Sequence, residues 1–233
     1  MDGTFKGIER MKNIFVFITL LLTSACSDDL EIQQPSNTNS KKIILIGDSI
    51  AEGHPHLHSH LHKGSVNEPG QISYELGNLL GENIENAGIG GNTSTDLRKR
   101  WSRDIENKKP THIFIHVGIN DVFKIDTKET IENFDFFIHY AETNNIKLYF
   151  SNIGPHLDHT PETIKNATFL NNSLLDYEKI YSHVIIIDYL SWATDGTNNF
   201  KHLKDGMFAD YTHPNKNGYK SYSEFIYKSI KAL

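Results

Sequence analysis

The sequence predicts a single α/β domain in which a parallel sheet of about five strands lies between two layers of helices, a three-layer α/β/α sandwich. Short apolar runs recur along the chain, and helix-length polar or amphipathic segments separate them. Strands that alternate with helices in this way are typical of a parallel sheet with helices on both faces. Residues 41–233 suffice for one such domain with a sizeable core, and they contain no internal repeat. The predicted strands lie at residues 43–46, 83–86, 112–117, 146–150 and 184–187.

The N-terminal segment has the pattern of a secretory signal. Lys12 precedes an apolar run at residues 14–22, and small residues follow that run up to Ala25. The run is too short to be a stable membrane anchor. We therefore expect a signal peptide at residues 1–25, with Met11 as an alternative start; a soluble protein with an apolar N-terminus is the other interpretation.

The residue that follows this segment, Cys26, is the only cysteine in the chain, so a disulfide within the chain is impossible. The arrangement resembles a bacterial lipoprotein signal. This resemblance implies that Cys26 is lipidated and that the protein is anchored in the bacterial cell envelope, to the periplasmic or surface face of the outer membrane. Residues 26–40 are polar and lack periodicity, which predicts a flexible tether.

The first predicted strand delivers a serine to the edge of the sheet. Four branched apolar residues, Ile43 to Ile46, suit a strand that is covered on both faces, and Gly47 permits a sharp exit. Ser49 follows at the carboxyl end of the strand, where α/β proteins bind ligands and where a helix N-terminus can face an anion. Asp48 and Ser49 could also form an ordinary turn or helix cap.

A histidine-dense stretch follows the serine. On an extended segment alternate side chains share one side, and imidazole is a good ligand for zinc and copper. No cysteine and few carboxylates accompany these histidines, so a solvated loop is the favoured interpretation and a metal patch is the alternative. The stretch contains His54, His56, His58, His60 and His62.

Two further strand ends carry groups that can stabilise a negative charge. The glycine-rich stretch at residues 86–94 contains Gly91, whose backbone N–H could face an oxyanion, and its last residues can cap the following helix. Asn120 follows the next strand, and its side-chain amide can donate to the same oxyanion. Each stretch also has a purely structural interpretation, as a tight turn or a helix cap.

Near the C-terminus, Asp210 stands three residues before His213. In that arrangement the carboxylate can hold one ring nitrogen while the other faces a nucleophile. Pro214 biases His213 away from helical geometry and suits the first turn of the last helix. That helix is predicted by apolar residues at helical spacing, which should form one buried stripe: Tyr219, Tyr222, Phe225, Ile226 and Ile230.

The four stretches together resemble the sequence blocks of the SGNH hydrolase superfamily, also called GDSL esterases and lipases, and they occur in the family's order. The resemblance covers the whole predicted domain. It implies a flavodoxin-like sheet, Ser49 as the nucleophile, and Asp210 and His213 as its partners in a catalytic triad. It also implies an oxyanion hole made by the N–H of Ser49, the N–H of Gly91 and the amide of Asn120. No metal and no organic cofactor are expected.

From this resemblance we expect a serine esterase that hydrolyses short acyl esters, above all acetyl esters, on small molecules or carbohydrate. A lysophospholipase or thioesterase is the alternative within enzymes, and transfer of the acyl group to another sugar uses the same chemistry. A carbohydrate- or metal-binding envelope lipoprotein without turnover is the alternative outside enzymes. The formal net charge of -6 gives no basic footprint for nucleic acid. The sequence predicts no particular oligomeric state.

Overall fold

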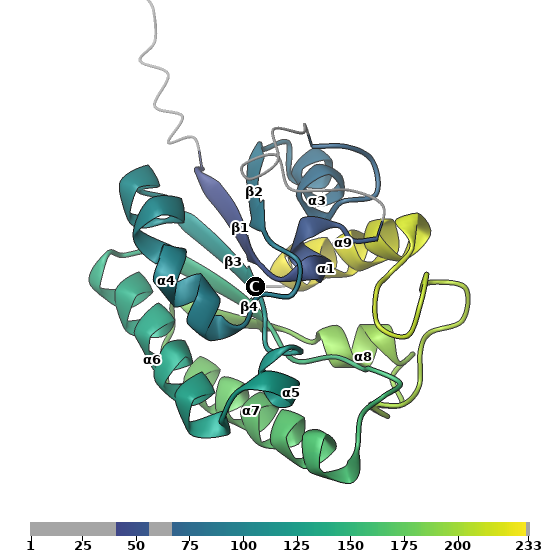
Figure 1. Ribbon diagram of the computed structural model, residues 1–233. Helices are drawn as coiled ribbons and strands as arrows, with labels where there is room; N and C mark the ends of the chain where they lie inside the picture. The colour runs from purple at the N-terminus through teal and green to yellow at the C-terminus, as the bar shows by residue number, and fades with distance from the viewer. Residues whose placement is uncertain (1–40, 56–66, 232–233) are drawn as a thin grey trace, which may run out of the picture. The chain divides into compact units, whose positions relative to one another are not determined.

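The structure of the protein is a computed structural model that describes residues 41–55 and 67–231 (Figure 1). The expected signal peptide, Cys26 and the tether up to residue 40 lie outside the described residues. Of the histidine-dense stretch, His54 is described, and the histidines from His56 to His62 lie outside. Within the described ranges, no helix has both the length and the apolar character needed to cross a membrane.

The centre of the described part is a sheet of five parallel strands in the order β2-β1-β3-β4-β5. The parallel sheet predicted from the alternation of strands and helices is therefore confirmed, and the observed strand ends differ from the predicted ones by at most two residues. The strands are β1 (Ile43–Gly47), β2 (Ile84–Gly88), β3 (His112–His116), β4 (Lys147–Ser151) and β5 (Val184–Ile187).

Helices cover both faces of this sheet, which gives the predicted three layers. One face carries α4 (Ser94–Asp104), α6 (Thr127–Thr143) and α7 (Pro161–Ile180). The other face carries α3 (Ile72–Leu80), α8 (Tyr189–Ala193) and α9 (Lys216–Lys231). Figure 1 shows α4 and α6 to the left of the sheet and α3 and α9 to its right. The remaining short helices are α1 (Ser49–Glu52), the 3-10 helix η1 (Glu106–Lys108) and α5 (Asp121–Lys124).

Strand β1 lies in the interior because its alternating side chains enter both cores. Ile44 and Ile46 belong to the apolar cluster under α4, α6 and α7, whereas Ile43 and Leu45 belong to the cluster under α3, α8 and α9. Burial of apolar side chains on both faces is the main force that holds such a strand in place. The continuous apolar run of β1 is thus explained by its position between two helical layers.

The strand order fixes where a ligand can bind. Strand β1 pairs with β2 on one side and with β3 on the other, so the chain leaves β1 toward one edge and β2 toward the opposite edge. In open α/β sheets, the crevice outside the carboxyl ends of the strands at such a reversal is the usual ligand site. Ser49 begins α1 at this point.

The last helix forms the predicted buried stripe, with one correction at its start. Tyr219, Tyr222 and Ile226 are fully buried, and Phe225 and Ile230 pack at the margin of the same cluster. Pro214 does not lie in the first turn of α9, because the helix begins two residues later. Pro214 instead forms an isolated antiparallel bridge with Phe208. The side chain of Asn215 accepts from the N–H of Gly218 at 2.9 Å and so caps the helix start.

Candidate active site

Ser49 is the first residue of α1, and Asp48 caps that helix. Oδ1 of Asp48 accepts a hydrogen bond from the backbone N–H of Ile50 at 2.9 Å. Asp48 therefore acts as the helix cap, and the adjacent Ser49 stays available as a functional residue. The sharp exit from β1 depends on Gly47, because a Cβ atom there would lie 2.0 Å from the carbonyl oxygen of His116. Strand β1 can thus end close against β3 and present Ser49 at the edge of the sheet.

His213 is placed between Ser49 and Asp210. Its Nε2 atom lies 2.9 Å from Oγ of Ser49, and its Nδ1 atom lies 2.8 Å from Oδ2 of Asp210. The structure therefore brings together the three residues of the predicted triad. A carboxylate accepts hydrogen bonds, so Asp210 favours the tautomer with the proton on Nδ1 and leaves Nε2 able to accept the serine proton.

The spacing of Asp210 and His213 has a local cause. Oδ1 of Asp210 accepts from the backbone N–H of Thr212 at 2.9 Å and from that of His213 at 2.8 Å, which closes a tight turn around the carboxylate. Partial burial raises the pKa of Asp210, but these hydrogen bonds and the one from the His213 ring outweigh it and hold the pKa below its ordinary value. Asp210 is therefore ionised at neutral pH.

The predicted oxyanion donors line the same pocket as Ser49. Gly91 and Asn120 both lie on its wall. The N–H of Gly90 is already occupied, because it donates to Oε2 of the buried Glu52 at 2.8 Å. Within the described residues, the N–H groups of Ser49 and Gly91 donate to no protein acceptor. The amide of Asn120 donates one hydrogen to the carbonyl of Asn92 at 3.1 Å, which orients it and leaves its second hydrogen available.

Arg100 links the glycine-rich loop, which forms this wall of the pocket, to the end of β1. No sequence motif indicated this role. From α4 its guanidinium donates to the carbonyl of Gly47 at 2.9 Å, to the carbonyl of Ala87 at 2.7 Å and to the side chain of Asn92 at 2.9 Å. The buried carboxylate of Asp104 balances its charge at 2.6 Å. Because one planar group holds the ends of β1 and β2, the serine and the glycine-rich loop keep a fixed separation.

The pocket has a volume of about 260 Å³. Sequence reasoning missed four of the residues on its wall: Phe123, His156, Tyr211 and Thr212. The rings of Phe123 and Tyr211 are 41% and 47% exposed, and each contacts the ring of His156. The one available signal was that His156 follows the fourth strand, so it belongs to the same sheet edge as the predicted site.

A second aspartate–histidine pair, Asp48 and His116, lines a small cavity together with Tyr189. Oδ2 of Asp48, Nδ1 of His116 and the hydroxyl of Tyr189 are buried. None of these atoms has a hydrogen-bond partner among the described residues. Burial, with a smaller contribution from the charge of Asp121, raises the pKa of Asp48 to about 7, and burial lowers the pKa of His116 to about 3. At slightly acidic pH both side chains are therefore neutral.

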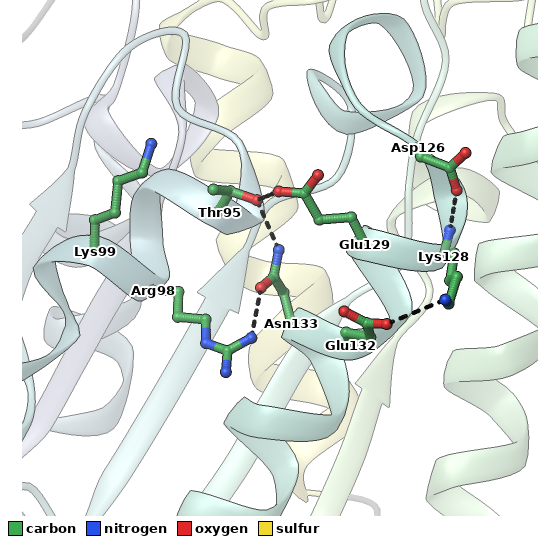
Figure 2. A pocket seen from close by; sticks show the side chains of 8 residues that line it. All are labelled: Thr95, Arg98, Lys99, Asp126, Lys128, Glu129, Glu132 and Asn133. Atoms are coloured by element: carbon green, nitrogen blue, oxygen red, sulfur yellow. Dashed lines mark hydrogen bonds and ion pairs between the residues drawn. The ribbon is translucent and has the colours of Figure 1, made fainter.

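A wider hollow on the surface between α4 and α6 contains none of the predicted site residues (Figure 2). Its polar side chains bind one another: Arg98 donates to Asn133 at 3.3 Å, and Lys128 lies 3.8 Å from Glu132. Figure 2 shows these contacts spread along the two helices. The described residues that line the hollow include no serine, cysteine or histidine, whereas the Ser49 pocket combines a serine with histidines.

Comparison with known proteins gives a family match over most of the chain. A model of the GDSL-like lipase/acylhydrolase family matches residues 45–221. The acetylxylan esterase of Geobacillus stearothermophilus is 36% identical over 93 residues, which are 37% of this chain and 42% of that protein. The uncharacterized lipoprotein YqeF of Bacillus subtilis (strain 168) is 28% identical over 141 residues, which are 58% of this chain and 53% of that protein. The matches thus span about half the length of these curated relatives.

Among solved structures, a GDSL-like lipase from Bacteroides thetaiotaomicron superimposes with a TM-score of 0.63. The superposition covers 83% of this chain and 89% of the other, at 23% sequence identity. At this identity the likeness shows the fold alone.

Proposed function

This chain belongs to the GDSL-like lipase/acylhydrolase family, a family of ester hydrolases, and on that premise we propose that it hydrolyses short acyl esters through Ser49. The observation that carries the proposal is the contact of 2.9 Å between Oγ of Ser49 and Nε2 of His213, while Asp210 holds the opposite ring nitrogen. A serine hydroxyl is a weak nucleophile until an adjacent base removes its proton, and this geometry supplies the base.

The reaction follows from these contacts. Ser49 attacks the ester carbonyl as His213 takes its proton, and the carboxylate of Asp210 stabilises the imidazolium that forms. His213 then gives the proton to the leaving alcohol, and an acyl-serine remains. Water attacks this acyl-serine with His213 again as the base, which releases the acid and restores Ser49. Transfer of the acyl group to a sugar hydroxyl would follow the same steps with a different acceptor.

The negative charge that develops on the carbonyl oxygen needs donors that are already in place. The N–H groups of Ser49 and Gly91 and the second amide hydrogen of Asn120 are the donors that we assign to this role. The bond from Asn120 to the carbonyl of Asn92 at 3.1 Å supports the assignment, because it holds the amide in one orientation. Removal of one such donor in comparable enzymes costs roughly 10²–10³ in kcat.

The size of the pocket favours a substrate with a short acyl group. Its volume of about 260 Å³ lies just below the usual range of ligand sites, roughly 300–1,000 Å³. The exposed rings of Phe123 and Tyr211 offer flat apolar surfaces to the alcohol part of the substrate, which suits the apolar face of a sugar. A relative named acetylxylan esterase is consistent with acetyl groups on carbohydrate as the substrate class.

We place the protein at the cell envelope, anchored through a lipid on Cys26. The segment before Cys26 supports this, and so does the relative that is named as a lipoprotein. If Cys26→Ser leaves the protein in membrane fractions of the native host, the anchor at this residue is wrong.

The proposed activity is tested with para-nitrophenyl acetate and the protein expressed without residues 1–26. We expect turnover well above the background rate and a loss of about 10³-fold or more in Ser49→Ala, because the acyl-serine cannot form. Circular dichroism of the variant controls for folding. The butyrate and octanoate esters run in parallel: a rate that falls with chain length supports the short-acyl assignment, whereas a maximum at octanoate favours a lysophospholipase or thioesterase. Equal rates for the wild type and a folded Ser49→Ala would refute the serine mechanism.

A further inference from the structure

Three side chains that can bind a metal ion converge beside the catalytic serine. One ligand atom from each of His54, Asp210 and His213 lies within 4.8 Å of the others. The ring centroids of His54 and His213 are 4.5 Å apart, with an angle of 60° between the ring planes. Within residues 41–55 and 67–231, this is the one group of three such side chains. Its members come from two distant parts of the chain, so local sequence spacing did not indicate it.

The chemistry of this group suits a zinc-type cation. Two imidazole nitrogens and a carboxylate oxygen form a three-ligand set that zinc uses when a fourth position stays open to solvent or substrate. In a tetrahedral site with bonds of about 2.0–2.2 Å, the ligand atoms lie roughly 3.4 Å from one another. Shifts of about 1 Å or less would bring the three side chains to that spacing. A cation can also reach them, because the side chain of Asp210 is 30% exposed and His54 is not fully buried.

We propose that Zn²⁺, or a divalent cation of similar chemistry, binds His54, Asp210 and His213 and thereby reversibly inhibits the enzyme. This inference rests on the proposed function only for its inhibitory effect; the binding site stands on the geometry alone. His54 is the residue that distinguishes the site, because Asp210 and His213 already have roles in ester hydrolysis and His54 has none in that mechanism.

The inhibition follows from the number of lone pairs on the His213 ring. A neutral imidazole carries one proton and one free lone pair. If the cation binds Nδ1, the ring proton resides on Nε2, which can then no longer accept the proton of Ser49. If the cation binds Nε2, the lone pair that would accept that proton is occupied. With either nitrogen the base is lost, no bond to substrate forms or breaks, and removal of the cation restores the free enzyme.

The site competes with the hydrogen bonds of the triad. Binding at Nδ1 replaces the contact of 2.8 Å between His213 and Asp210, and binding at Nε2 replaces the contact of 2.9 Å to Ser49. Either exchange opposes metal binding, so the protein should take up zinc reversibly and release it to a chelator. Reversible occupation is the behaviour expected of an inhibitory site, in contrast to a permanently occupied structural site.

The test separates binding from activity. Calorimetric titration of Ser49→Ala with ZnCl₂ measures binding in a protein that cannot turn over. It is repeated with His54→Gln added, and with His139→Gln added as the control, because His139 is an exposed residue of α6 outside the site. We expect the dissociation constant to rise about tenfold or more with His54→Gln and to be unchanged with His139→Gln. Equal affinity in all three proteins would overturn the site.

The inhibitory effect is measured on enzymes with Ser49 intact. Turnover of para-nitrophenyl acetate is titrated with ZnCl₂, and each rate is divided by the same variant's rate in EDTA. We expect EDTA to reverse the inhibition and His54→Gln to need about tenfold or more zinc for half-inhibition. Binding without inhibition would overturn the proposed effect on the base. If no ester is hydrolysed at all but zinc binding depends on His54, the proposed function fails and the metal site stands.

Discussion

Two aspartate–histidine pairs lie near Ser49, and they differ in hydrogen bonding and in the pKa of their aspartates. Asp210 and His213 are joined by a direct hydrogen bond of 2.8 Å, the side chain of Asp210 is 30% exposed, and His213 lines the pocket of Ser49. Asp48 and His116 line a small cavity, and Oδ2 of Asp48 and Nδ1 of His116 have no partner among the described residues. The pKa of Asp210 is lowered, whereas burial raises the pKa of Asp48 to about 7.

The difference shows that the balance between burial and hydrogen-bond donors decides whether a carboxyl group keeps its charge. Asp210 receives backbone N–H groups and a ring N–H, which outweigh its partial burial and keep it charged. Asp48 is fully buried, and this burial outweighs its backbone hydrogen bonds, above all the one from Ile50, so the carboxyl group holds its proton well above the usual pH. A charged Asp210 can orient and stabilise a histidine base, whereas a neutral Asp48 can serve only as a helix cap and a packing element.

The largest expected effect is that of Asp210→Asn on turnover. The Asn amide can donate to Nδ1 of His213, which favours the tautomer with the proton on Nε2 and removes the base. We expect kcat for para-nitrophenyl acetate to fall roughly 10³–10⁴-fold with little change in stability. Asp205→Asn, an exposed aspartate on the same segment, is the control and should stay within about twofold. A variant at Asp210 that keeps a tenth of the wild-type kcat would remove the contrast between the two pairs.

The next effect is that of Asp48→Asn on the pH dependence of stability. The pKa of Asp48 is about 7 in the folded protein and 3.8 in the unfolded reference, so the folded state holds a proton that the unfolded state has lost. The stability due to this proton is complete below pH 3.8 and is lost as the pH rises toward 7. The amide that replaces the carboxyl group cannot titrate, so the stability of the variant relative to the wild type should increase by on the order of 4 kcal/mol between pH 4 and pH 7.5.

Urea unfolding at a series of pH values measures this difference. The Asn side chain keeps an oxygen that can accept from Ile50, so the variant should fold and should lose far less activity than Asp210→Asn. Parallel stability curves for the wild type and Asp48→Asn would mean that Asp48 titrates normally and that its environment is not as dry as the cavity indicates.

Much of the fold and of the candidate site could be predicted from the sequence. The fold was predictable because most strands are short apolar runs, β2 being the weakest of them, and β1 shows most clearly that a run without alternation is a strand buried on both faces. Asp210 and His213 were predictable because only two residues separate them and the turn between them closes locally. Ser49, Gly91 and Asn120 were identified through strand ends and family motifs, since parallel strands bring their carboxyl ends to one edge.

The features that were missed depend on contacts between distant segments. Arg100 lies in the middle of a polar helix, and nothing in its neighbours indicates that it reaches the ends of β1 and β2. The neutral state of Asp48 follows from burial against His116 and Tyr189, which the fold brings from other strands and helices. A short sequence motif does not show how deeply its residues are buried, so the raised pKa of Asp48 could not be inferred from the Gly-Asp-Ser motif.

The smallest effect sharpens the description of the cavity that Asp48 and His116 line. The hydroxyl of Tyr189 has no partner among the described residues, so Tyr189→Phe removes a buried polar group that makes no hydrogen bond there and should change the free energy of unfolding by less than about 1 kcal/mol. Tyr222→Phe is the matched variant, because the hydroxyl of Tyr222 lies 2.6 Å from Oγ of the buried Ser151. Its loss leaves Ser151 unpaired and should cost about 1–3 kcal/mol. If Tyr189→Phe is the more damaging of the two, the Tyr189 hydroxyl has a partner such as a buried water shared with Asp48 and His116, and the second pair is a bonded network instead of two isolated neutral groups.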